Sequence, residues 1–146
     1  MRIDELRKVV EREYSRLCEV LKLDPIPLDV YLVDEDSKQF SELGISLKSP
    51  LAFYDKEKII LPRTDNELNA LQNYEPKFPP IVWDKAHPKE WPLWRVELWH
   101  EVCHQVENDI IRGWKGGVEG GDAWKDAVIY IAKCFKVTKE QVTAIL

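Results

Sequence analysis

Apolar side chains recur every three or four positions along two long stretches of this chain, residues 3–23 and residues 93–112. That spacing places the apolar side chains on one face of an α-helix, so the pattern predicts two amphipathic helices. The first helix must end at the "DPIP" of residues 24–27, because a proline disfavours the helical conformation in the residue before it. A last helix is predicted to begin at Asp122, a favourable N-cap residue, and to continue through Phe135.

Shorter apolar runs predict strands between the first two helices. Residues 28–35, "LDVYLVDE", have the length and composition of a short strand. Residues 51–63, "LAFYDKEKIILPR", predict either two short strands around a polar turn at residues 55–58 or one long bent strand. Residues 64–92 are rich in proline and predict an irregular connection, with one helical turn over residues 65–73.

The order of these elements predicts an α+β fold. An N-terminal helix would pack on a small, mostly antiparallel sheet, with the helix of residues 93–112 beneath the sheet and the last helix closing a cleft. Glycines make residues 113–121 a loop between the last two helices. The sequence contains no internal repeat, so residues 1–146 are expected to form one domain, an ordinary size for a single core.

Composition narrows the classes of function. No apolar run approaches the roughly 20 residues that a membrane span needs, so no membrane partner is expected. The three cysteines, Cys18, Cys103 and Cys134, form no C-x-x-C pair, and their odd number favours a reducing, cytoplasmic compartment. The formal net charge of −5, with no dense cluster of lysine and arginine, disfavours a nucleic-acid partner.

The candidate chemistry lies in "WHEVCHQ", residues 99–105. His100 and His104 are one helical turn apart, so both imidazoles project from one face and can bind one Zn²⁺ at about 2.0–2.1 Å each. Glu101, between them, could deprotonate a water molecule at the metal. On a helical wheel the apolar residues fill a neighbouring arc, which places the pair at the edge of the core, where a cleft can open.

A zinc site that keeps one position open for water needs a third protein ligand. Glu107 follows His104 by three positions, but three ligands at i, i+4 and i+7 are spread too far along a helix, so it is expected to be a solvated acid or a partner of a ligand. We favour Glu119, which is flanked by glycines, is longer than aspartate and has no evident structural role. Asp122 is the alternative ligand, although its role as a helix N-cap competes, and Asp126 could orient a histidine.

The motif His100-Glu101-Val102-Cys103-His104, the preceding hairpin "AFYDKEKIILP" and the acidic start of the last helix resemble the zincin metallopeptidases, in particular the small minigluzincin kind. The resemblance covers about residues 28–135 in order, and H-E-x-x-H is its specific part. It implies that two histidines and a downstream acid or histidine bind zinc while the motif glutamate is the general base. These roles fall on His100, His104 and Glu101.

Two groups within this resemblance differ at the third ligand. SprT-like proteases place a histidine shortly before an aromatic residue, as in "HGxxW"; here "EGGDAW" matches at Trp124, and Glu119 would replace the histidine from one place away. ImmA/IrrE-type regulators and gluzincins use a glutamate on the last helix, and "DAWKDA" is similar, with Asp122 and Asp126 in place of glutamates. The resemblance therefore leaves both Glu119 and Asp122 open.

The functional prediction is zinc-dependent hydrolysis of a peptide or protein substrate, with Glu101 as the base. Two alternatives belong to other classes. One is a catalytically silent zincin-fold module that has kept or lost its zinc and has a binding or regulatory role, and zinc bound without turnover would indicate it. A structural helical protein in which H-E-x-x-H occurs by chance would bind no metal at all.

Overall fold

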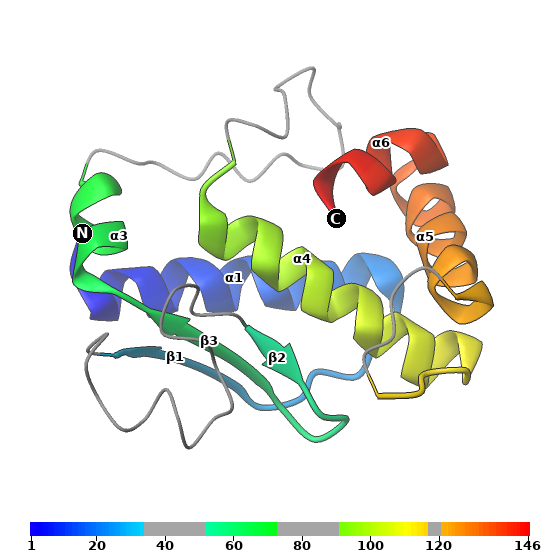
Figure 1. The fold of residues 1–146 in the computed structure, drawn as a ribbon, viewed down its shortest axis with the longest axis horizontal. Helices are drawn as coiled ribbons and strands as arrows, with labels where there is room; N and C mark the ends of the chain where they lie inside the picture. The colour runs from blue at the N-terminus through cyan, green and yellow to red at the C-terminus, as the bar shows by residue number, and fades with distance from the viewer. Residues whose placement is uncertain (34–51, 73–90, 117–120) are drawn as a thin grey trace.

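The structure is a computed structural model, and it describes residues 1–33, 52–72, 91–116 and 121–146 (Figure 1). The described part is an α+β fold, as predicted. In chain order its elements are α1 (Ile3–Leu21), β1 (Leu28–Leu32), β2 (Phe53–Tyr54), β3 (Ile59–Arg63), α3 (Asp65–Ala70), α4 (Leu93–Val106), the π-helical segment η2 (Glu107–Ile111), α5 (Asp122–Phe135) and α6 (Lys139–Ile145). Within these ranges, every helix is too short or too polar to cross a membrane.

Helix α1 confirms the predicted N-terminal helix. One face of it, which includes Leu6, Val10, Leu17 and Leu21, is buried. The helix ends at Lys22, which adopts the left-handed conformation with φ of 58° and whose backbone N–H donates to a carbonyl of the last turn. A left-handed residue of this kind is a common helix terminator, and here it directs the chain into the proline-containing connection to β1.

The sheet has the strand order β1-β3-β2. Strands β2 and β3 form an antiparallel hairpin, which confirms the two-strand reading of residues 51–63. Its turn is closed by Asp55, whose Oδ1 accepts hydrogen bonds at 3.0 Å from the backbone N–H groups of Glu57 and Lys58. The side chain of an aspartate often accepts hydrogen bonds from the backbone of a turn in this way, which stabilises the turn.

The prediction of a mostly antiparallel sheet is wrong, because β1 pairs with β3 in parallel over five residues, Leu28–Leu32 with Ile59–Arg63. Parallel neighbours require a long connection, and the chain between β1 and β3 is long enough to return to the starting end of the sheet. All five residues of β3 are buried, as expected for a central strand. The sheet in the described residues is therefore mixed.

Helix α4 is the centre of the packing. It contacts α1, β2, β3 and α5, and Figure 1 shows it lying across α1, with the sheet on one side of it and α5 and α6 on the other. Residues Trp94, Leu98, Val102, Cys103 and Val106 of α4 are almost fully buried in the common core. A helix enclosed on several sides has little freedom to rotate, so side chains at the edge of its buried face are held in fixed positions.

Two features of the C-terminal helices differ from the sequence-based expectation. Gly121, rather than Asp122, is the N-cap of α5, and Asp122 is its first helical residue. A carboxylate in the first turn is still favoured by the helix dipole. Helix α6 was not predicted, although Thr138 and Gln141 form a capping box of the kind that marks a helix start.

A buried ion pair joins the two long helices. Glu13 of α1 and Arg95 of α4 are 3% and 4% exposed, and Arg95 Nε donates to Glu13 Oε1 at 2.7 Å. Burial raises the pKa of Glu13 from its ordinary value of 4.5 to about 7, while the charge and hydrogen bond of Arg95 oppose the rise. Desolvation of the carboxylate is therefore the larger effect.

The pH dependence of unfolding is predicted to report on Glu13. Because its folded pKa lies above the unfolded value, its stabilising contribution is complete below the unfolded pKa of 4.5 and is lost as the pH rises through about 7. The free energy of unfolding of wild type relative to Glu13→Gln should fall by on the order of 3 kcal/mol across this window. Denaturant titrations at several pH values measure it, and a constant difference would show that Arg95 keeps Glu13 ionised.

Candidate metal centre

A cavity of about 530 Å³ lies between strand β2, helix α4 and the segment around Trp114 and Gly116. The three motif residues His100, Glu101 and His104 all line it from α4. They reach it together because the i, i+4 spacing puts both histidines on the same edge of a helix whose other face is buried in the core. The structure thus brings these three sequence-predicted residues to one cavity.

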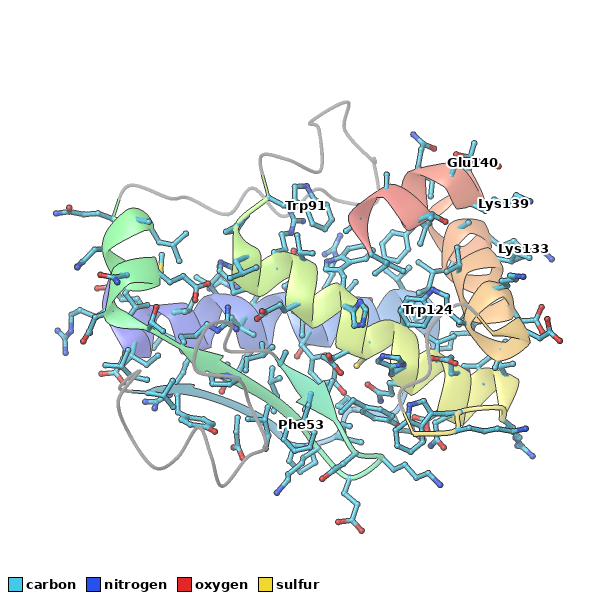
Figure 2. The ribbon with its side chains drawn as sticks, in the orientation of Figure 1. Phe53, Trp91, Trp124, Lys133, Lys139 and Glu140 are labelled. Carbon is cyan, nitrogen blue, oxygen red and sulfur yellow. The ribbon has the colours of Figure 1, made fainter. Side chains whose placement is uncertain are left out.

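The two histidine rings are close neighbours. Their centroids are 5.0 Å apart, with the ring planes inclined by 78°. Trp124 of α5 packs against both, with centroid separations of 5.1 Å to His100 and 4.8 Å to His104. Figure 2 shows Trp124 between α5 and the C-terminal half of α4. Its side chain limits the rotation of both imidazoles, a contact that the sequence did not predict.

Glu107 lies directly beside one of the two histidines. Its Oε1 is 2.7 Å from Nδ1 of His104, and the two side chains are only 3% and 6% exposed. The sequence allowed two roles for Glu107, a solvated acid or a partner of a ligand. The first is wrong, because Glu107 is buried, and its carboxylate instead contacts the candidate ligand His104. A carboxylate on Nδ1 leaves Nε2 as the nitrogen of His104 that could bind a metal ion.

Carboxylates also line the cavity. Glu101 is 7% exposed and faces the same space as the histidines. Glu97, one turn earlier on α4, lines it as well, and its carboxylate pairs with the fully buried guanidinium of Arg63 from β3. Burial raises the pKa of Glu97 to about 7, with Arg63 opposing the rise. This ion pair attaches α4 to the sheet at the cavity wall, and no signal in the sequence identified Arg63 as its partner.

The opposite wall of the cavity comes from β2 and the chain after η2. Tyr54 and Trp114 both line it, and their rings meet edge to face at a centroid separation of 5.2 Å. Burial raises the pKa of Tyr54, so the phenol stays protonated. Gly113 allows the chain after η2 to approach α5, since a Cβ atom there would lie 2.8 Å from Cβ of Ala123. The cavity therefore has one polar wall on α4 and one largely aromatic wall.

The third ligand is the part of the site that the structure leaves open. Glu119, the favoured candidate, lies outside the described residues. Asp122 and Asp126 are exposed on α5. Within the described ranges, no three side chains of histidine, cysteine, aspartate or glutamate form a group that could hold one metal ion. Asp122 therefore does not complete a ligand set with the two histidines in this arrangement.

The donor chemistry present nevertheless fits zinc. Zn²⁺ is bound in proteins by imidazole nitrogens, and a ligand histidine usually donates its other N–H to a carboxylate or a carbonyl group. His100 and His104 supply two adjacent imidazoles, and Glu107 supplies the carboxylate on His104. Comparisons of the chain with family models, curated proteins and solved structures find no match. Function is therefore inferred from the residues of the cavity.

Proposed function

We propose that this chain is a zinc-dependent metallopeptidase with a minimal zincin-like domain. The observation that carries the proposal is the placement of His100, Glu101 and His104 on one edge of α4, where all three line the same cavity. In this proposal the two histidines hold the zinc ion. Glu119 is the third ligand, with Asp122 as the alternative. Helix α4 is the active-site helix, and α5 closes the cleft.

In the proposed reaction, His100 and His104 would hold the zinc ion and Glu101 would transfer the proton. Bound zinc supplies a Lewis acid, which lowers the pKa of a water molecule and polarises the substrate carbonyl. Glu101 accepts the proton of the attacking water as the water oxygen bonds to the carbonyl carbon. Glu101 then delivers that proton to the amide nitrogen while the carbon–nitrogen bond breaks, so one water and one peptide give one acid and one amine.

The position of the sheet supports a peptide as the substrate. Strand β2 borders the cavity and is an edge strand of the described sheet. An extended peptide can pair with an edge strand through backbone hydrogen bonds, which would bring its carbonyl groups past the candidate metal site. Phe53, labelled in Figure 2, and Trp114 both line the cavity and add aromatic surface for substrate side chains. The net charge of −5 disfavours a nucleic-acid substrate.

Peptide cleavage that depends on zinc is the expected result. Protein loaded with one equivalent of zinc should cut a mixture of unstructured peptides, detected as new termini by mass spectrometry. A chelator should abolish the cleavage, and added zinc should restore it. Zinc bound without any cleavage would instead support the silent binding or regulatory module. A protein that takes up no zinc would leave the chance motif as the explanation.

A further inference from the structure

The contact between Glu107 and His104 is more than proximity on a helix. The side chains of Glu107 and His104 are both almost fully buried, so both have lost their water, and a desolvated carboxylate is costly unless it is paired. The contact of 2.7 Å is within the range of a strong, charge-assisted hydrogen bond. It joins residues three positions apart, whose side chains are neighbours on a helix.

The backbone at Glu107 is also distinctive. The α-helical hydrogen bonding of α4 ends at Val106, and the π-helical segment η2 begins at Glu107. The Glu107 carbonyl accepts a hydrogen bond from the N–H of Gly113 at 2.9 Å, after Arg112 has turned the chain in the left-handed conformation. The carbonyl of Glu107 is therefore held by the turn that follows η2.

We infer that Glu107 is a positioning residue that holds His104 in the tautomer and orientation needed to bind the metal. A neutral imidazole carries its proton on one of two nitrogens, and a metal ion binds the other one. The contact of 2.7 Å joins Glu107 Oε1 to Nδ1 of His104, so a hydrogen bond donated by Nδ1 would occupy that nitrogen and leave the lone pair of Nε2 for the metal. Trp124 packs against the same ring at 4.8 Å and limits its rotation. This inference rests on the proposed function, because it assumes that His104 is a ligand.

A purely structural role is the competing explanation, and the chain contains a matched example of one. The pair of Glu13 and Arg95 has the same separation of 2.7 Å and a similar burial. Neither of its residues lines the cavity that holds the motif. If Glu107 serves only to stabilise the fold, substitutions at Glu107 and at Glu13 should have the same consequences. If it positions a ligand, only substitutions at Glu107 should change metal binding.

The test compares Glu107→Ala, Glu107→Gln and the control Glu13→Gln. Zinc affinity is measured for each by competition with a chromophoric chelator. Loss of a carboxylate partner of a ligand histidine typically weakens metal binding about 10–100-fold, and this loss is expected for Glu107→Ala. Glu107→Gln should recover part of the affinity, because its amide oxygen still accepts a hydrogen bond from Nδ1. Glu13→Gln should lower stability and leave the zinc affinity at the wild-type value.

Nuclear magnetic resonance gives a second readout that does not need zinc. Long-range proton–nitrogen spectra of the metal-free protein report which nitrogen of His104 carries the proton, and Nδ1 is expected in the wild type, with a mixture in Glu107→Ala. Wild-type zinc affinity and an unchanged tautomer in Glu107→Ala would overturn the positioning role alone. A wild-type protein that binds no zinc would overturn the proposed function first, and with it the role of His104 as a ligand.

Discussion

Replacement of Glu101 by glutamine should abolish most peptide hydrolysis while zinc remains bound. Glutamine has nearly the same shape as glutamate, but it cannot accept the proton of the attacking water at neutral pH. Positioned general bases typically contribute about 10²–10⁴-fold to a rate, so kcat should fall by that factor. KM should change little, because Glu101 acts on the water rather than on the bound peptide. Steady-state kinetics on a peptide that the wild type cleaves measure kcat and KM, and metal analysis of the same variant measures the bound zinc.

Glu13→Gln is the matched control for this experiment. It also neutralises a buried carboxylate, but on α1, away from the lining of the cavity. Its kcat should equal that of wild type at a temperature where both are folded. If Glu101→Gln instead keeps full turnover, Glu101 is not the base. If Glu101→Gln loses zinc as well as activity, the carboxylate of Glu101 is needed for metal binding.

Loss of either motif histidine should remove the metal. Wild type purified without an affinity tag is expected to carry about one zinc per chain, since a structural or catalytic zinc site binds tightly at neutral pH. His100→Ala and His104→Ala each delete one of the two adjacent imidazoles, and their zinc content should fall close to zero. Metal analysis by mass spectrometry measures this directly.

Thermal unfolding provides an independent readout of the same variants. A ligand that binds only the folded state stabilises it by RT ln(1 + [L]/Kd), about 2.7 kcal/mol when free zinc is 100 times Kd. Added zinc should therefore raise the midpoint temperature of unfolding of the wild type and leave that of His100→Ala and His104→Ala unchanged. His87, the remaining histidine of the chain, supplies the control: His87→Ala should keep its zinc. Equal zinc content in all variants would mean that the metal binds elsewhere.

The same assay can identify the third ligand. Glu119→Ala is expected to lose most of the zinc affinity, whereas Asp122→Ala should keep it, because Asp122 is an exposed residue in the first turn of α5. The reverse result would make Asp122 the ligand. It would also require α5 to approach the histidines more closely than it does in this structure.

Helical periodicity depends only on residues close together in the chain, and it was sufficient to predict the two long helices of the fold. The apolar spacing predicted α1 and α4, and the same spacing placed His100, Glu101 and His104 on one edge of α4. Helix α6 was missed although its signal was equally local, the Thr138–Gln141 capping box. The sheet was different, because pairing between β1 and β3 joins segments far apart in the chain. No short pattern specifies whether such a pair is parallel.

The sequence by itself determined the candidate chemistry: two imidazoles and a carboxylate in fixed register, because a helix sets their spacing without any other element. Only the tertiary structure decided their surroundings. It buried Glu107 against His104, placed Trp124 on both histidines, and paired Glu97 with Arg63 from the sheet. The physical reason is that burial and pKa depend on which elements pack over a helix face. That packing is a property of the whole chain.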